Sequence, residues 1–378
     1  MSEGIVKHGL EGVFAGETSI CAVKAEEGKL IYRGYDVHAL AEEASFEEVA
    51  YLLLHEKPPT RSELETFDQQ LKADRALRPE ILELLRRLPT QAPAMDSLRA
   101  AVSILGLYDP DLEDNSHEAN LRKSVRLLAC LTTLVAAHYR ISQGLEVLSP
   151  NSNLNHAANF LYMLRGSLPD QFEARVLEIT FILYAEHEFN ASTFTSRVVA
   201  STLSDLHGAV TAALASLKGP LHGGANEKAM EVLLEIGDPA QAEAWVVNAL
   251  KEKKRIMGFG HRIYKKADSR VELAKKYGKL LAERKKEKKW HEICQTVETI
   301  MRQEKNLFPN VDFYSGPIYY LMGIPINLYT PLFACSRVVG WSAHVMEQKR
   351  KNRLFRPNSL YIGPEGLDFI PLAKRNAQ

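Results

Sequence analysis

Between residues 45 and 350 the apolar residues recur every three to four positions, which is the spacing of one face of an amphipathic helix. The first such segment begins with Ser45 and Glu48, which predict a capping box: the serine side chain accepts from the Glu48 amide while the carboxylate reaches back. Thr60 and Glu63 open the next segment with the same device. We therefore expect helix to follow helix.

Further segments with this spacing are joined by Gly, Pro, Asn and Asp, and they predict helices over residues 121–141, 170–187, 193–217, 226–236, 240–253, 270–287, 290–304, 313–322 and 331–350. Strand-like sequence is confined to residues 10–35, where residues 12–16 and 29–34 predict a short amino-terminal β hairpin. No strand alternates with the helices, and no G-x-G-x-x-G segment follows a strand, which argues against a dinucleotide-binding sheet. The predicted fold class is mainly α.

The 378 residues are 46% hydrophobic and 25% charged, which is ordinary for a globular protein with a sizeable core. Lys plus Arg and Asp plus Glu both number 47, so no basic excess favours nucleic acid or an anionic membrane as a partner. The four cysteines lie far apart, without a C-x-x-C pair or zinc-ligand spacing, and predict reduced thiols. Without an apolar run of about 18 residues or a signal-like amino terminus, the expected location is the cytoplasm.

Two of the twelve histidines stand in glycine-broken turns, His222 within residues 219–224 (GPLHGG) and His261 within residues 258–262 (GFGHR). Glycine permits positive φ and lets a ligand approach the backbone closely, so we interpret this pair as acid–base groups at a small-molecule site. Asp312 follows as a third candidate, although its place just before a predicted helix favours a capping role. The other histidines are interpreted as structural or exposed, except His156, which stays undecided.

Polar side chains also gather at residues 187–193 (HEFNAST), between two apolar helices, where they fit either a binding cluster or paired helix caps. Three arginines lie in unexpected surroundings: Arg270, Arg337 and Arg356. A guanidinium is expensive to bury unless an anion meets it, and its fork geometry suits carboxylates. Several such arginines predict a ligand with more than one carboxylate.

Taken together, these segments resemble the citrate synthases, in particular the shorter dimeric type of bacteria and archaea, and the closely related 2-methylcitrate synthases. The similarity runs from residue 9 to residue 357 and includes the segments 32–35 (YRGY), 46–49 (FEEV), 187–193, 219–227 (GPLHGGANE), 256–265 (IMGFGHRIYK) and 308–316 (FPNVDFYSG). The resemblance implies a large helical domain of residues 1–222, a small helical domain of residues 223–316 that closes over the active site, and a continued large domain of residues 317–378 with a carboxyl-terminal arm.

The resemblance also implies a reaction. Acetyl-CoA condenses with oxaloacetate in a Claisen-type step, and hydrolysis of the thioester gives citrate and CoA, the first step of the tricarboxylic acid cycle. Asp312 is then the base that removes a methyl proton, and His222 donates a hydrogen bond to the thioester oxygen. His261 polarises the ketone oxygen and protonates it. A neutral donor in a dry site can hold the enol, so no metal or other cofactor is implied.

The family pattern also places the substrates. Oxaloacetate is expected on His187, Arg270, Arg337 and Arg356. Coenzyme A is expected on Ile256, Met257, Gly258, Gly260, Ile263, Tyr264 and Lys265. Asn190 and Ser192 are expected to support these residues from behind. Because Arg356 is expected to reach the partner subunit's active site, the resemblance makes a homodimer necessary for activity.

Two features depart from the family pattern. Ser269 stands where the family usually has a proline between Asp and Arg, which predicts a modest loosening of Arg270. The chain also lacks the amino-terminal extension of the larger hexameric enzymes, so regulation by NADH is not expected. Two alternatives stay open: a 2-methylcitrate synthase acting on propionyl-CoA, because one methylene changes selectivity by only about 1–3 kcal/mol, and a catalytically silent helical scaffold.

Overall fold

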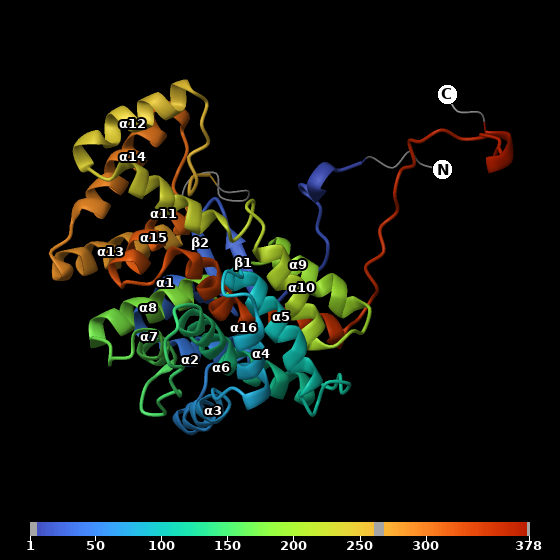
Figure 1. Ribbon diagram of the computed structural model, residues 1–378, viewed down its shortest axis with the longest axis horizontal. Helices are drawn as coiled ribbons and strands as arrows, with labels where there is room; N and C mark the ends of the chain where they lie inside the picture. Colours follow the sequence, from blue (N-terminus) through green and yellow to red (C-terminus); the bar gives the residue numbers. More distant parts are fainter. Residues whose placement is uncertain (1–5, 261–267, 376–378) are drawn as a thin grey trace.

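The computed structural model of the protein describes residues 6–260 and 268–375, and most of these residues are helical (Figure 1). The helices are α1 (Val37–Glu43), α2 (Phe46–His55), α3 (Arg61–Ala73), α4 (Pro79–Arg87), α5 (Ala94–Leu107), α6 (His117–Ser142), α7 (His156–Arg165), α8 (Gln171–Tyr184), α9 (Ala191–Ser201), α10 (Leu206–Leu217), α11 (Ala225–Ile236), α12 (Pro239–Lys251), α13 (Arg270–Lys285), α14 (Lys289–Lys305), α15 (Val311–Leu321) and α16 (Tyr329–Arg350). Short 3₁₀ helices lie at His8–Leu10, Ile326–Leu328 and Leu372–Lys374. The predicted mainly α fold is confirmed.

The strands form one small antiparallel sheet near the amino terminus, made of β1 (Cys21–Lys24), β2 (Lys29–Tyr32) and β3 (Tyr35–Asp36) in that order. The prediction of a strand over residues 12–16 is wrong. That segment lies outside the sheet, and its Phe14 side chain is 98% exposed. The hairpin instead pairs Cys21 with Tyr32, because this register buries Ile20, Leu30 and Tyr32 together beneath the sheet.

The helix predictions agree with the structure to within a few residues, and both capping boxes are present. The exception is the single helix predicted over residues 193–217, which is divided into α9 and α10. Leu203 adopts a left-handed φ of 67° between them. The Asp205 side chain then accepts the Gly208 amide at 2.8 Å and starts a new helix. The apolar spacing continues across this break, which is why the sequence pattern does not reveal it.

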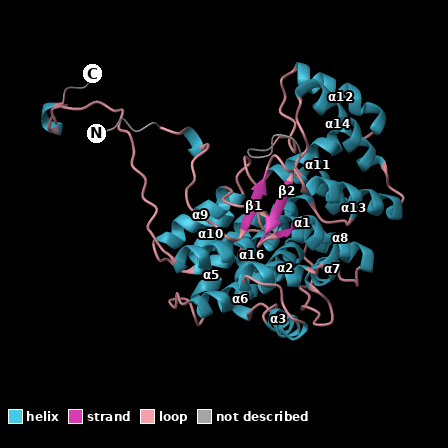
Figure 2. Cartoon of the chain, turned by 180° about the vertical axis from the view of Figure 1, so that it is seen from behind, coloured by secondary structure: helices cyan, strands magenta, loops and turns pink. Residues whose placement is uncertain are grey.

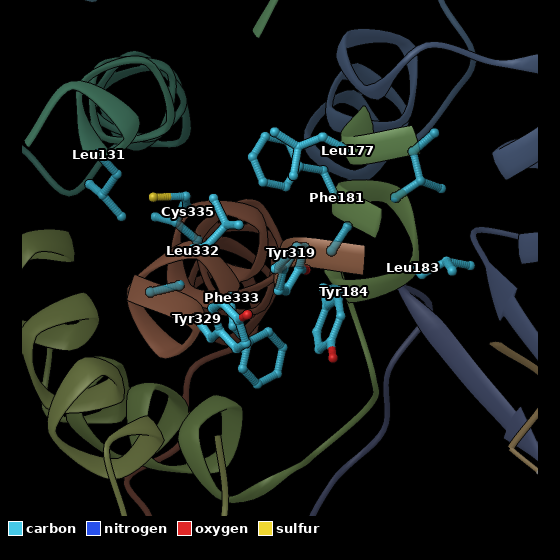
Figure 3. Close-up of a cluster of buried hydrophobic side chains, with 14 of the residues drawn as sticks. Leu131, Leu177, Phe181, Leu183, Tyr184, Tyr319, Tyr329, Leu332, Phe333 and Cys335 are labelled. Atoms are coloured by element: carbon cyan, nitrogen blue, oxygen red, sulfur yellow. The ribbon is translucent and has the colours of Figure 1, made fainter. Parts of the chain in front are cut away.

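Helix α16 runs through the middle of the helical body and contacts α2, α5, α6, α8, α9 and α10 (Figure 2). Nearly all its side chains are buried, including the large Trp341 and the charged Arg337. Leu332 and Cys335 of α16 and Leu177 and Phe181 of α8 belong to one buried apolar cluster (Figure 3). Burial of this kind stabilises by roughly 25 cal/mol per Å² of apolar surface. It fixes α16 as a rigid support for the polar groups that it carries.

Helices α11 to α15 are grouped at one end of the molecule, where α12 packs on α14 and α15 packs on both α11 and α13 (Figure 1). The Glu298 carboxylate of α14 joins three of these helices, because it accepts hydrogen bonds from Lys275 of α13 and Tyr314 of α15. His222 lies just before this group and Asp312 lies within it. No helix in the described ranges is both long and apolar enough to cross a membrane.

Candidate active site

Asp312 lies in the first turn of α15, but it does not cap the helix. Asn310 is the N-cap, and its side-chain oxygen accepts the Asp312 amide at 3.1 Å. The interpretation of Asp312 as a helix cap is therefore wrong. Its carboxylate is turned instead toward α8, where the Tyr184 hydroxyl donates to Oδ1 at 2.6 Å.

The Asp312 side chain is partly buried. Burial raises the pKa of Asp312 to about 6, and the Tyr184 hydrogen bond and the positive charges of Arg270 and Arg337 oppose that rise. The Tyr184 ring packs edge-on against Phe333 of α16, with 4.5 Å between ring centroids, and Figure 3 shows the two side chains next to each other. A carboxyl group with a pKa near 6 is suited to act as a general base at neutral pH.

His222 lies in the turn between α10 and α11, and its ring also meets Phe333 edge-on, with 6.4 Å between the ring centroids. Its Nε2 is 3.3 Å from the Ser192 amide, which can only donate, and 2.8 Å from Ser192 Oγ. Nε2 is therefore an acceptor, and in the neutral ring the proton is on Nδ1. Burial, aided by the positive charge of Arg337, lowers the pKa of His222 to about 4, so the ring is neutral at physiological pH.

Ser192 and Asn190 support this histidine and also cap a helix. Asn190 is the N-cap of α9, and its side-chain oxygen accepts the Thr193 amide at 3.1 Å and lies 2.8 Å from Ser192 Oγ. The Trp341 indole of α16 donates to Ser192 Oγ at 3.1 Å. The helix-cap interpretation of the 187–193 cluster is thus confirmed for Asn190, and the cap that begins α9 also holds Ser192 against His222.

The three candidate arginines are in different situations. Arg337 is 1% exposed, its Nε donates to the Tyr184 carbonyl at 2.6 Å, and its guanidinium lies over the Phe333 ring at 4.6 Å. Within the described ranges, no hydrogen bond or ion pair is found for Nη1 or Nη2 of Arg337. Burial lowers its pKa from the ordinary value. Arg337 is therefore a buried cation whose two terminal nitrogens remain available to a ligand in the described part of the protein.

Arg270 is also buried, but it forms a two-point ion pair with Asp268: Nε donates to Oδ1 at 2.9 Å and Nη2 donates to Oδ2 at 2.7 Å. This pairing holds the guanidinium although Ser269 replaces the usual proline. Arg356 lies elsewhere, exposed on the chain after α16, with Nη1 bonded to the side-chain oxygen of Asn358 at 3.0 Å. Within one chain, the structure does not bring Arg356 to the other site residues.

The segment predicted to hold coenzyme A is tied to the residues before Asp312. The Asn310 amide donates to the Gly258 carbonyl and the Gly260 amide donates to the Phe308 carbonyl, both at 2.9 Å. Gly258 has a φ of 86°, and a Cβ there would lie 2.9 Å from the Cβ of Phe313, so a side chain would displace the start of α15. Ile256, Met257, Gly258 and Gly260 are described, whereas the candidates His261, Ile263, Tyr264 and Lys265 lie outside the described residues.

His187 is buried in the turn between α8 and α9, two residues beyond Ala185, the C-cap of α8. Its neighbour Glu186 is fully buried, with Oε1 2.9 Å from His344 Nε2. Among the described residues no group of three or more His, Cys, Asp or Glu is placed to hold a metal ion.

Comparison with known proteins gives a consistent result. The family model described as "Citrate synthase, C-terminal domain" matches residues 9–358. The chain is 45% identical over 368 residues to citrate synthase 2 of Bacillus subtilis, covering 97% of this chain and 98% of the relative. The chain belongs to the citrate synthase family. It is also 45% identical over 360 residues to the 2-methylcitrate synthase of Mycobacterium tuberculosis, covering 95% of this chain and 91% of the relative.

A solved structure from the citrate synthase family supports the fold assignment. The citrate synthase of Thermoplasma acidophilum, in a ternary complex with carboxymethyl coenzyme A and oxaloacetate, superposes with a TM-score of 0.92 at 34% identity. The match covers 98% of this chain and all of that chain. The two chains therefore share one fold.

Three residues that contact the candidate site residues are not indicated by the sequence pattern described above: Tyr184, Phe333 and Trp341. The last two recur with Arg337 at steps of four, so they share one face of α16, and this spacing was a readable signal. The sequence gives no such signal for Tyr184, because a tyrosine at the end of an apolar helix is ordinary. Its role depends on α8 meeting α15, and the local sequence does not encode that contact.

Proposed function

We propose that this protein condenses the methyl carbon of acetyl-CoA with the ketone carbon of oxaloacetate and hydrolyses the product thioester to citrate and CoA. We place this reaction in the cytoplasm, as the first step of the tricarboxylic acid cycle. One observation carries the proposal: the Phe333 ring packs against a neutral histidine, His222, and against Tyr184, whose hydroxyl bonds a carboxylate with a pKa near 6, beside the buried cation Arg337. That arrangement suits proton abstraction next to a carbonyl in a substrate that carries carboxylates.

The first step is formation of the enol. Asp312 takes a methyl proton from acetyl-CoA, and the electrons of the broken C–H bond move toward the thioester oxygen. His222 is oriented to donate its Nδ1 proton to that oxygen, since Nε2 is already an acceptor from Ser192. A ring that is neutral at pH 7 stabilises the enol by a hydrogen bond and does not require a charged donor.

The second step joins the carbons. The enol carbon attacks the ketone carbon of oxaloacetate, and the ketone oxygen receives a proton from His261, as the family pattern implies. The terminal nitrogens of Arg337 are suited to one oxaloacetate carboxylate. Arg270 and His187 are expected to bind the same substrate, as the family pattern implies. Water then cleaves the citryl thioester. Its hydroxyl joins the acyl carbon and its proton joins the leaving thiolate of CoA.

Coenzyme binding and base placement are coupled in this scheme. The hydrogen bonds from Asn310 to Gly258 and from Gly260 to Phe308 make the expected coenzyme segment and the start of α15 one unit. We further propose that residues 223–316 move as the small domain against residues 1–222 and 317–378. Closure over bound oxaloacetate would keep water from the enol until the carbon–carbon bond has formed.

The acyl group is the feature to test first. Relatives named for citrate and for 2-methylcitrate synthesis match this chain equally well at 45% identity, which keeps propionyl-CoA as the alternative substrate. We expect kcat/KM for acetyl-CoA to exceed that for propionyl-CoA by about tenfold or more, the selectivity that one methylene in a pocket allows. The measurement is release of the CoA thiol from each thioester with oxaloacetate present, followed with a chromogenic disulfide.

The outcomes separate the candidates. A preference for propionyl-CoA would assign the protein to 2-methylcitrate synthesis. Absence of thiol release from both thioesters, with a normal circular dichroism spectrum, would support the silent scaffold. A control without oxaloacetate distinguishes condensation from simple thioester hydrolysis.

We also propose that the active enzyme is a homodimer. Residues 351–375, the carboxyl-terminal arm, leave the body as an extended chain, and the amino-terminal segment projects on the same side (Figures 1 and 2). Ile362 is 91% exposed and Phe369 is 83% exposed on this arm, as is Phe14 at 98% on the amino-terminal segment. Several large apolar side chains exposed to solvent on these two segments are suited to pack against a second subunit.

If the arm carries Arg356 into the partner subunit's site, two inactive variants will complement each other. Arg356→Ala and Asp312→Asn are each expected to be inactive as homodimers. Co-expression gives mixed dimers in half the population, each with one site that has both Asp312 and Arg356, so we expect about a quarter of wild-type thiol release. If Arg356 served the site of its own chain, no mixed dimer would have an intact site and activity would not return. Arg353→Ala on the same arm is the matched control.

A further inference from the structure

Tyr184 has no part in the mechanism above, although it contacts the proposed base directly. It is the last residue of α8, and its side chain is 1% exposed. Its hydroxyl oxygen is 2.6 Å from Asp312 Oδ1 and 2.6 Å from Ser315 Oγ. The ring is fixed by the edge-on contact with Phe333. The hydroxyl is therefore held at one point beside the carboxylate.

The direction of these hydrogen bonds follows from the acceptor. An ionised carboxylate can only accept, so the single proton of the Tyr184 hydroxyl is donated to Asp312. The remaining lone pairs of the phenol can then accept from Ser315, one turn along α15 from Asp312. Ser315, Tyr184 and Asp312 thus form one directed chain that ends at the carboxylate.

The two oxygens of Asp312 are not equivalent. Oδ1 accepts from Tyr184, whereas Oδ2 accepts no hydrogen bond from any residue within the described ranges. Oδ2 is also not sealed within the protein, because Asp312 is only partly buried. The oxygen that is free to take a proton is therefore determined by which oxygen Tyr184 occupies.

We propose that Tyr184 is a positioning residue for the base: its hydroxyl holds Asp312 Oδ1 and so directs Oδ2 toward the acyl methyl group. This inference rests on the proposed function, since it assigns a role only if Asp312 removes the proton. Without the hydroxyl, the carboxylate can rotate about its χ2 bond, and a base that samples several orientations is less often in line for transfer. Substrate binding by Arg337 and Arg270 does not require the phenol hydroxyl, so the effect falls on turnover.

The Tyr184 hydroxyl also affects the pH range in which the Asp312 carboxyl group is ionised. Titratable groups act on Asp312 from three parts of the fold: Asp268 just before α13 and Arg270 at its first residue, Arg337 on α16, and the neutral phenol of Tyr184 on α8. Of these, the Tyr184 hydrogen bond is the largest effect that lowers the carboxyl pKa. Its removal raises that pKa further above its ordinary value. Because the base must be ionised to act, the acidic limb of kcat/KM then moves to higher pH.

The experiment is Tyr184→Phe, which keeps the ring and deletes only the hydroxyl. We expect kcat at pH 8 to fall about 10- to 100-fold, the loss of one hydrogen bond to a charged group. The KM for oxaloacetate should stay within about twofold, and the acidic limb, near pH 6 in the wild type, should move upward. Ser315→Ala should give a smaller change in the same direction.

Tyr329→Phe is the matched control. Tyr329 is a fully buried tyrosine of α16 whose hydroxyl has no hydrogen-bond partner in the described part of the chain. Its removal should leave kcat and the pH profile unchanged. If Tyr184 had a purely structural role, Tyr184→Phe would lower the thermal stability and the fraction of active enzyme, and the acidic limb of the pH profile would stay in place. If the Tyr184→Phe enzyme had the kcat of the wild type and an unchanged acidic limb in its pH profile, the positioning role would be overturned. If the wild-type enzyme released no thiol, the proposed function itself would be overturned.

Discussion

Replacing Asp312 by Asn is expected to reduce kcat by about 10²- to 10⁴-fold, the usual contribution of a general base. Asparagine keeps the size of the side chain and keeps an oxygen that can accept from Tyr184. The amide cannot take up the methyl proton, however, so the loss should appear in kcat while the KM for oxaloacetate changes little. Steady-state thiol release at pH 8 measures both constants, well above the Asp312 pKa of about 6.

The control for this change is Asp205→Asn. Asp205 caps α10 through its side-chain oxygen, and asparagine caps helices about as well, so turnover and stability should both stay near wild type. An Asp312→Asn enzyme that kept more than about a tenth of wild-type kcat would contradict the assignment of Asp312 as the base. Exchange of the acetyl-CoA methyl protons with deuterated water gives a second readout, since it reports proton removal without condensation.

The helical fold was readable from the sequence because local signals agree with the packing. Ser45 and Thr60 open their helices as predicted, and the spacing of apolar residues sets the helix faces. Leu203 shows where that reasoning ends. The apolar spacing continues through it, and only its left-handed backbone conformation divides α9 from α10. The prediction of a strand over residues 12–16 is wrong for the opposite reason. The local sequence favours a strand, but no neighbouring strand pairs with this segment.

The site was readable only in part, because some roles depend on contacts between distant segments. His222 was a candidate because of its glycine-broken turn, whereas the turn-like surroundings of Asp312 favoured a helix cap and only the family resemblance implied a base. Tyr184 meets Asp312 across 128 positions of sequence, and no local pattern predicts that contact. The arginines show the same limit. Arg270 and Arg337 were both predicted to meet a ligand carboxylate, yet Asp268 pairs with the first, and the terminal nitrogens of the second have no partner within the described ranges.

That difference between the arginines leads to a sharp prediction for Arg337→Met. The buried guanidinium is suited to an oxaloacetate carboxylate, and losing charge-assisted hydrogen bonds of this kind costs about 2–5 kcal/mol. We therefore expect the KM for oxaloacetate to rise by about 10²- to 10³-fold. Without substrate, the methionine removes a desolvated cation whose pKa burial already lowers, so thermal stability should be unchanged or higher.

Arg197→Met provides the contrast that makes this test decisive. Arg197 is likewise a buried arginine, but its Nη1 donates to the Glu347 carboxylate at 2.7 Å and contacts His344, so it already has its anion. Its removal leaves Glu347 unpaired, and we expect a lower melting temperature with a nearly unchanged KM for oxaloacetate. Arg337→Met should therefore change mainly the KM for oxaloacetate, whereas Arg197→Met should change mainly the melting temperature. If Arg337→Met instead lost stability and kept its KM, Arg337 would be a structural cation and the carboxylate site would have to be sought elsewhere.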